Sequence, residues 1–204
     1  MIKSKDNKEL KISHSFKPSQ KIYEEYGYVL DFLPYGKQYK EKFKPIVFPI
    51  AQVIGEKYFT LLEVKLKPNV EVKIRDRLYI GKEKERDKVD RVIGRISYDE
   101  LTATAKSELL ATLEELVKNQ EQRFVAFFNK AQAITPKMHS LELLPSIGKK
   151  SMWQIINERE KKPFESFKDI QERVGISNLA KIIAKRILEE LSGESKYILF
   201  MRHS

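Results

Sequence analysis

The sequence predicts an α+β protein in which a small antiparallel β-barrel precedes a group of helices. Up to about residue 98, apolar and polar residues tend to alternate, which is the period of a half-buried strand. From about residue 101 onward, apolar residues recur every three or four positions, which is the period of a helix face. The change of period divides the chain near Tyr98 to Leu101.

The composition indicates a folded protein with a polyanionic partner. Of the 204 residues, 41% are hydrophobic and 33% are charged, and the formal net charge is +10. A basic excess favours nucleic acid as the partner, although solvated charges give the same total. No apolar run reaches the length of a membrane span, and the Lys-rich start lacks the apolar region of a signal peptide. We therefore expect a cytoplasmic protein without membrane contact.

Several kinds of site are excluded by composition. The chain has no cysteine, and His14, His139 and His203 lie far apart without metal-ligand spacing. Its few glycines form no phosphate-binding loop. We therefore expect no metal, no cofactor and no catalytic residue.

The N-terminal half is expected to form a basic arm and then five strands. Residues 1–20 show little periodicity and predict a flexible arm. Strands are expected from short β-rich runs at 21–33, 46–54, 58–66, 70–80 and 89–96. Short strands at this spacing predict a small antiparallel barrel of the OB or a related type over residues 21–98.

Basic side chains on the predicted strands are candidates for contact with a nucleic-acid backbone. Arg75 and Arg77 are the ones that we select, because they project beside aromatic rings. Bases could stack on exposed rings, but Tyr and Phe on strand faces more often pack in a core. The run from Lys82 to Lys88 alternates in sign and predicts a solvated loop.

Residues 99–136 are expected to form helices that pack on both the barrel and the C-terminal part. Two apolar stripes at helical spacing indicate this: Ala105, Leu109, Leu113, Leu116 and Val117, then Phe124, Phe127, Phe128 and Ala131. Such stripes are more often core than functional surface.

The most informative stretch is a helix–turn–helix pattern between Leu141 and Ile156. Pro145 predicts the end of a short helix, and Met152 begins the apolar spacing of another. Gly148 is expected where the chain turns tightly between them. The unpaired N–H groups at the start of a helix attract anions, and lysines there would add positive charge. The predicted phosphate clamp consists of Ser146, Ile147, Gly148, Lys149, Lys150 and Ser151.

The segment Leu143-Leu-Pro-Ser-Ile-Gly-Lys-Lys150 resembles the hairpin of helix-hairpin-helix DNA- and RNA-binding domains, which usually reads Leu-Pro-Gly-Ile-Gly. Ser146 stands in place of the first glycine. Met152 replaces a small residue, usually alanine, that lets the two helices approach. The resemblance implies contacts to a phosphate backbone.

A second, degenerate hairpin of this kind is expected within residues 137–204. Ser166 to Asp169 resembles a capping box, and Val174-Gly-Ile-Ser177 leads into another amphipathic helix. Two such units commonly pack as a pair that tracks both strands of a duplex. Repulsion between like charges on that helix costs about 0.3 kcal/mol unless an anion is present, so a binding face and a solvated face are both open. The residues concerned are Lys181, Lys185 and Arg186.

The whole order of elements resembles an uncharacterised archaeal family that carries only a domain-of-unknown-function label, family 655. The match is carried by Arg95 to Thr102, Arg123 to Asn129 and Leu141 to Gly148. The resemblance implies an OB-like barrel followed by an all-helical tandem helix-hairpin-helix domain, and nucleic-acid binding without an assigned activity.

We therefore predict a non-catalytic protein that binds structured RNA or a duplex, because amides and lysines recognise phosphate rather than base edges. One alternative is a protein-interaction scaffold with unknown partners. A less favoured one is a DNA-processing enzyme, as in some glycosylases, using Lys149 or Lys150 with Asp169. The sequence offers no apolar pocket to make either lysine a neutral nucleophile. The expected domains are 1–20, 21–98, 99–136 and 137–204.

Overall fold

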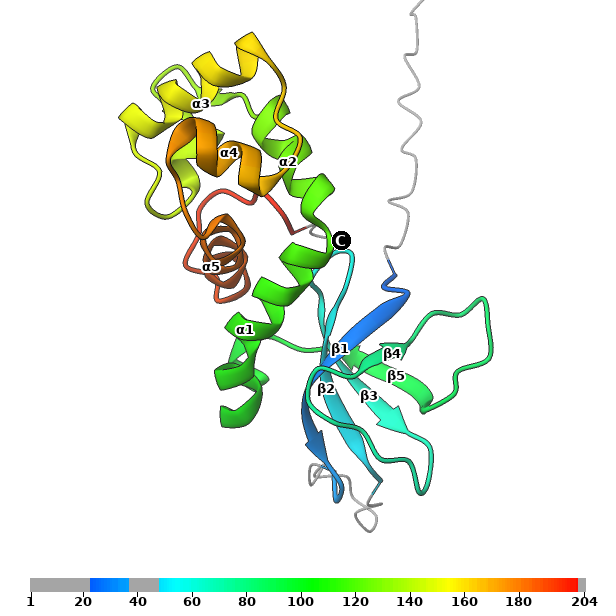
Figure 1. The fold of residues 1–204 in the computed structure, drawn as a ribbon. Helices are drawn as coiled ribbons and strands as arrows, with labels where there is room; N and C mark the ends of the chain where they lie inside the picture. Colours follow the sequence, from blue (N-terminus) through cyan, green and yellow to red (C-terminus); the bar gives the residue numbers. More distant parts are fainter. Residues whose placement is uncertain (1–22, 37–47, 202–204) are drawn as a thin grey trace, which may run out of the picture.

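The computed structural model describes residues 23–36 and 48–201, so the expected basic arm lies outside the described residues. In these ranges the chain forms a curled five-stranded antiparallel sheet followed by five α-helices (Figure 1). The prediction of an α+β fold with a small antiparallel barrel followed by helices is confirmed at this level. None of the helices in these ranges is long and apolar enough to cross a membrane.

The sheet is a half-barrel whose strand order is β4-β1-β2-β3-β5, with every neighbouring pair antiparallel. β4 and β5 are therefore its two edges. The strands are β1 (Tyr26–Leu33), β2 (Ile50–Gly55), β3 (Leu61–Leu66), β4 (Arg77–Tyr79) and β5 (Val89–Arg95).

The fourth strand is shorter than the sequence predicts, since its alternating pattern predicts an extended backbone throughout 70–80. Arg75 has a φ of 70°, which no regular strand contains. The N–H of Arg75 donates to the carbonyl oxygen of Val29 at 2.7 Å, and the N–H of Asp76 donates to that of Lys73 at 3.0 Å. A turn from Lys73 to Asp76 therefore interrupts the segment, and β4 begins only at Arg77.

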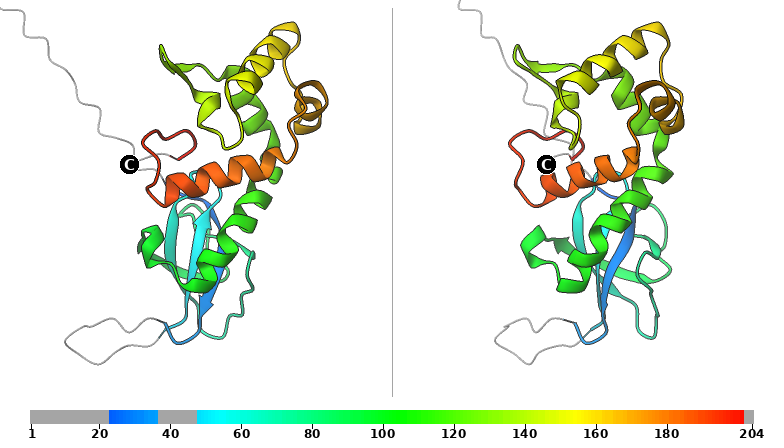
Figure 2. Two further views of the ribbon diagram at one scale, coloured as in Figure 1. Left: turned by 90° about the vertical axis from the view of Figure 1, so that its left-hand side faces the viewer. Right: turned by 60° about the vertical axis from the view of Figure 1, so that its left-hand side comes forward.

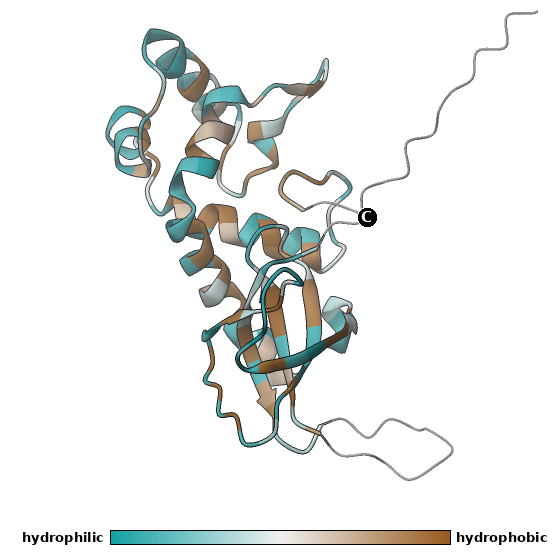
Figure 3. Ribbon diagram, turned by 90° about the vertical axis from the view of Figure 1, so that its right-hand side faces the viewer, coloured by the Kyte–Doolittle hydropathy of each residue, from teal (hydrophilic) through white to brown (hydrophobic). Residues whose placement is uncertain are grey.

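Both faces of the sheet are covered. Val29, Val53 and Val64 are buried inside the curl, while the alternate residues Leu30 and Ile54 face the helices. Figure 3 shows hydrophobic residues concentrated on the strands and on the helices next to them. The period-2 pattern of the sequence therefore reflects two separate layers of core.

The mainly helical part extends from a 3-10 helix at residue 98 to residue 191. Its elements are η1 (Tyr98–Glu100), α1 (Ala103–Asn119), α2 (Glu121–Lys130), β6 (Ala133–Thr135), β7 (Met138–His139), η2 (Ser140–Leu143), α3 (Lys149–Lys161), α4 (Phe167–Val174) and α5 (Leu179–Leu191). α1 packs against both β1 and α5, whereas α3 and α4 lie at the end of the molecule away from the sheet (Figures 1 and 2).

One buried cluster joins the sheet to the helices. Leu30, Ile54 and Leu61 of the sheet belong to the same cluster as Leu109 and Leu113 of α1. The change from strands to helices does fall at Tyr98 to Leu101. The same change of period predicts that residues 99–204 fold independently, and this stays a prediction. Such a fragment would expose the α1 face that packs on the sheet.

A buried hydrogen-bond network fixes the start of α1 on the sheet. The Gln52 side chain is fully buried and donates to Glu63 Oε1 at 3.0 Å and to the carbonyl oxygen of Glu100 at 3.1 Å. It also accepts the N–H of Thr102 at 2.9 Å. The Thr102 hydroxyl donates to Asp31 Oδ2 at 2.6 Å. These bonds set the direction in which α1 leaves the sheet.

Arg173 connects α3 to α4. Its guanidinium pairs with Asp169 Oδ2 at 3.2 Å and Glu158 Oε2 at 3.5 Å, and it donates to the carbonyl oxygens of Glu158 and of Lys162, the latter at 2.7 Å. It also lies over the ring of Phe164, 4.5 Å from the centroid. One side chain therefore satisfies the end of α3 and positions the start of α4.

We expect Arg173→Ala to lower the free energy of unfolding by about 2 kcal/mol, because hydrogen bonds to charged groups are removed in a half-buried place. Arg173→Lys should recover little of this, since an ammonium cannot reproduce the planar fork of donors. Urea denaturation of both variants measures the effect. A Lys variant as stable as the parent would contradict this role.

Candidate nucleic-acid interface

The first hairpin, Leu144 to Gly148, turns at Ser146. The N–H of Ile147 donates to the carbonyl oxygen of Leu144 at 3.1 Å, which closes a β-turn with Pro145 in its second position. Ser146 has a φ of 68°, the left-handed value that this turn normally reserves for glycine. Gly148, expected at the tight turn, instead has an extended backbone with a φ of −91°. The sequence analysis therefore assigned the turn to the wrong residue.

Buried side chains on both sides anchor this hairpin. Leu141, Leu144 and Ile147 are buried, as are Met152 and Ile155 of α3. The helix before the turn, η2, is a 3-10 helix of only four residues. These buried side chains therefore hold the hairpin backbone from the core side, while its other side faces solvent.

His139 and Glu142 cap η2. The N–H of His139 donates to Glu142 Oε2 at 2.8 Å, and the N–H of Leu141 donates to His139 Nδ1 at 3.1 Å. Burial, together with the nearby charge of Arg159, holds the pKa of His139 below its ordinary value. The imidazole therefore stays neutral and keeps its acceptor nitrogen at neutral pH.

The start of α3 presents unpaired donors. Gly148 is its N-cap and offers no side chain to accept a hydrogen bond. In the described ranges, the N–H groups of Gly148, Lys149, Lys150 and Ser151 have no acceptor. Lys149 and Lys150 are exposed and form no ion pair with any described residue. Four unpaired backbone amides and two lysine ammonium groups are thus located at the positive end of one helix.

The helix starts that follow the two hairpins differ from the others. Thr102 and Ser166 cap α1 and α4 with their hydroxyls, and α2 carries Glu121 in its first turn. α3 and α5 have neither a side-chain cap nor an acidic residue in the first turn. Among the α-helices of the described ranges, only these two therefore leave the positive end uncompensated.

The second connection, between α4 and α5, shares with the first a left-handed residue before the helix start, but its backbone differs in other respects. Gly175 has a φ of 78°, matching the left-handed Ser146, and it ends α4. α5 begins four residues after Gly175, whereas α3 begins three residues after Ser146. Asn178, which directly precedes α5, is also left-handed. Lys181 and Lys185 are exposed, and neither is paired with a described residue. Both lie on the outer side of α5, Lys181 within its first turn and Lys185 one turn later.

Arg186 does not lie on that outer side, which corrects the sequence-based assignment. Only 6% of the residue is exposed. Its guanidinium pairs with Glu190 Oε1 at 3.1 Å and Glu189 Oε2 at 3.4 Å, and it donates to the carbonyl oxygen of Tyr197. Arg186 holds the C-terminal segment against α5 and is withdrawn from the candidate interface.

The two arginines predicted on the barrel are engaged in ion pairs. Arg75 Nη2 lies 3.0 Å from Glu108 Oε2 on α1. Arg77 forms a two-pronged pair with Glu56, at 3.0 and 2.8 Å, and its guanidinium lies over the ring of Tyr26. Because both already have carboxylate partners, they are weaker candidates than the lysines of the hairpins.

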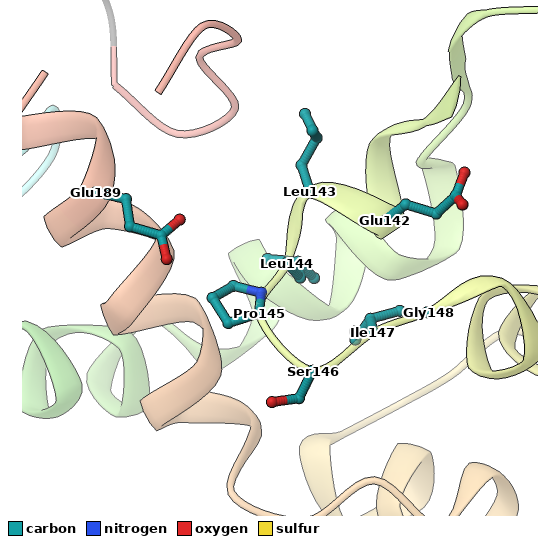
Figure 4. A pocket seen from close by; sticks show the side chains of 8 residues that line it. All are labelled: Glu142, Leu143, Leu144, Pro145, Ser146, Ile147, Gly148 and Glu189. Carbon is teal, nitrogen blue, oxygen red and sulfur yellow. The ribbon is translucent and has the colours of Figure 1, made fainter. Parts of the chain in front are cut away.

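A shallow hollow of about 430 Å³ lies beside the first hairpin (Figure 4). Its lining residues are Glu142, Leu143, Leu144, Pro145, Ser146, Ile147, Gly148 and Glu189. The two carboxylates make the hollow itself unsuitable for an anion. The favourable position for a phosphate is instead the open side of Gly148, where a Cβ would meet nothing within 4 Å.

Two observations bear on the enzyme alternative. Asp169 Oδ2 accepts the N–H of Glu165 at 3.0 Å and pairs with Arg173, so its carboxylate is part of the α4 start. No group of three or more His, Asp or Glu side chains that could hold a metal occurs in the described ranges. The site therefore consists of hydrogen-bond donors and positive charges.

Sequence analysis overlooked one residue of this region, Trp153 of α3. It is 58% exposed and stands one helical turn after Lys149. The signal was available, since Trp153 is the only tryptophan in the chain and falls outside the Met152, Ile155 and Ile156 stripe.

Comparison with known proteins gives consistent matches over most of the chain. A family model described as "Protein of unknown function (DUF655)" matches residues 23–202. The uncharacterized protein MJ0038 of Methanocaldococcus jannaschii is 54% identical over 182 residues, which are 88% of this chain and 81% of that protein. The crystal structure of Af1531 from Archaeoglobus fulgidus, which carries the same family label, is 48% identical with a TM-score of 0.79, and the match covers 88% of this chain and 100% of that one.

The left-handed Ser146 leads to a stability prediction. Ser146→Gly should raise the free energy of unfolding by about 1 kcal/mol, because glycine adopts a positive φ without steric cost. Ser146→Val should lower it by more than that amount, since a β-branched residue fits this region worst. Thermal and urea unfolding of the three proteins test the order. Equal stabilities would mean that the turn relaxes at no cost.

Proposed function

The chain belongs to the DUF655 family, whose description assigns no function, and we propose that it is a non-catalytic protein that binds nucleic acid through a tandem helix-hairpin-helix unit. The ligand is structured RNA or a duplex, held mainly by its phosphate backbone. The first hairpin, from Ser146 to Ser151, supplies the principal contact, and the second hairpin with Lys181 and Lys185 supplies another.

One observation carries this proposal, namely the uncompensated positive end of α3. Lys149 and Lys150 stand where the helix dipole opposes positive charge, which costs about 0.3 to 1 kcal/mol each. A phosphate at Gly148 would reverse that cost, because it would accept from the unpaired amides and attract both ammonium groups. The arrangement is unfavourable without an anion and favourable with one.

The chemistry of the site favours recognition of shape over sequence. Backbone amides and lysines contact phosphate oxygens, which are the same at every base pair. Arg173 fixes α3 relative to α4, so the two hairpins would present their donors at a constant separation. A pair of rigidly spaced phosphate contacts suits a double-helical backbone better than a disordered strand.

The proposal predicts the salt dependence of binding. Replacing Lys149 and Lys150 together by Ala should weaken binding about equally for all sequences of one nucleic-acid type. It should also reduce the slope of log K against log salt by about 0.9 for each duplex phosphate that the variant no longer neutralises. Unfolding should become slightly harder, because two charges that oppose the helix dipole are removed. Fluorescence anisotropy at several salt concentrations measures the slope.

The matched control removes two exposed lysines elsewhere, Lys84 on the β4–β5 loop and Lys118 on α1. The two double variants have the same net charge, so a difference between them reports position rather than total charge. If both variants bind alike, or if the hairpin variant keeps the parental slope, the hairpin is not the site. A protein-interaction scaffold would then be the better description.

Gly148 allows a second test in which stability and binding should move in opposite directions. Gly148→Ser places a Cβ and a hydroxyl at the N-cap, where the backbone is extended and nothing lies within 4 Å. The hydroxyl can accept an N–H of the first turn, which should stabilise the protein by a few tenths of a kcal/mol. Because it takes the place of the phosphate oxygen, binding should weaken about tenfold, corresponding to one charge-assisted hydrogen bond.

Gly148→Asp extends the same series. Its carboxylate caps the helix at least as well but repels phosphate, so binding should fall further while stability is retained. Binding that is unchanged in both variants would show that no phosphate approaches Gly148.

A further inference from the structure

We propose that Trp153 is a stacking platform for an unpaired nucleobase, so that the preferred ligand has single-stranded nucleotides next to a helical segment. This inference rests on the proposed function, because it places the base beside the phosphate held at the start of α3. It specifies a class of nucleic acid that the phosphate clamp alone does not distinguish from a simple duplex.

The placement of Trp153 carries the first step. Met152 and Ile155 bury the inner side of α3, while Trp153 is 58% exposed on the outer side. It follows Lys149 by four residues and Lys150 by three, so all three side chains share one helix face. Along the axis the indole lies about one turn, roughly 5.4 Å, beyond the clamp.

The second step is that the indole has no partner in the described part of the chain. No ring contact, cation–π contact or hydrogen bond involves Trp153 among residues 23–36 and 48–201. It is the one exposed large hydrophobic side chain on the α-helices of these ranges; the others, such as Ile134, lie outside the helices. More than half of the residue is therefore accessible to a ligand.

The third step concerns what that ligand can be. A single exposed apolar residue is common on protein surfaces, so the class of ligand must be inferred from the residues around Trp153. On its helix face, Asn157 is exposed one turn after Trp153, and Lys149 and Lys150 are exposed one turn before it. The remaining neighbour, Ile156, is partly buried against the core. A protein partner needs an apolar patch around its anchor, which these polar neighbours do not provide. A nucleotide offers a flat apolar base joined to a phosphate, which matches an indole beside lysines.

The base must be unpaired for this contact to form. Inside a duplex each base is paired and stacked on its neighbours, whereas the bases of a single-stranded extension, a bulge or a loop can be splayed out onto an aromatic side chain. Stacking on an aromatic ring is tolerant of sequence because every base has a π-face. Trp153 would thus select a structural feature of the ligand without selecting a sequence.

The only tryptophan of the chain makes the test direct, because intrinsic fluorescence then reports this one residue. The full-length protein is titrated with a blunt duplex and with the same duplex carrying a short single-stranded extension, each as RNA and as DNA. The extended ligand should quench the fluorescence strongly and bind more tightly, and the blunt duplex should bind with little quenching. The RNA and DNA arms identify which nucleic acid supplies the base.

Variants separate stacking from folding and from the clamp. Trp153→Ala should weaken binding of the extended ligand about tenfold and leave the blunt duplex unaffected, whereas Trp153→Phe should keep most of the affinity. Anisotropy with a labelled ligand measures both. The double variant at Lys149 and Lys150 should weaken both ligands, so failure of the clamp and failure of the stacking contact give different patterns.

Three outcomes would overturn the inference. One is an unchanged fluorescence spectrum at saturation with the extended ligand. Another is that Trp153→Ala binds each ligand as tightly as the parent does. The clamp would then remain supported, but the indole would have no role in binding. The third is a change in sedimentation of the protein without nucleic acid on Trp153→Ala, which would assign the ring to an interface between copies of this chain.

Discussion

The burial of α1 on two sides is the constraint on which the rest of the structure depends. Leu109, Leu113 and Leu116 are fully buried, because α1 packs on β1 and on α5 at once. Separating the two partners would expose one side of this wide apolar surface. α1 therefore links the sheet to α5, although sheet and helices are built from different sequence periods. The position of α5, and with it the second hairpin, follows from the direction of α1.

Buried polar groups fix what apolar packing leaves undetermined. Apolar surfaces tolerate sliding, but a hydrogen bond to a buried amide does not. Gln52 sets the start of α1, and Glu190 accepts the N–H groups of Leu199, Phe200 and Met201 to hold the C-terminal segment on α5. A site made of backbone amides needs such rigidity, because its donors cannot adjust by rotating a side chain.

Much of this arrangement was predictable from the sequence, for local reasons. Apolar periods and caps depend on neighbouring residues, so the strands of the large sheet, the α-helices and the Ser166 cap were found. The short pair β6–β7 was not predicted, and β6 lies in a segment expected to be helical. The start of β4 was missed because Arg75 adopts a left-handed backbone, which its residue type does not favour. Arg186 was misplaced because the segment after α5 folds back over it: the carbonyl oxygen of Tyr197 accepts from its guanidinium, a contact that helical spacing does not indicate. Its pair with Glu190 is at the ordinary i,i+4 spacing of a helix.

The same distinction explains which parts of the candidate site were found. Lys149 and Lys150 were identified because a helix start is a local feature of the sequence. The reason to regard the start of α3 as a site is different, since it comes from comparing the caps of the helices. A chain that places Thr102 and Ser166 at the N-caps of two helices has effective capping residues at its disposal. At α3 it has Gly148 followed by two lysines, which is less stable in the absence of an anion than a serine cap followed by acidic residues. Folding alone does not require that choice, because serine would fit the same extended backbone. This local loss of stability is the observation on which the proposed phosphate contact rests.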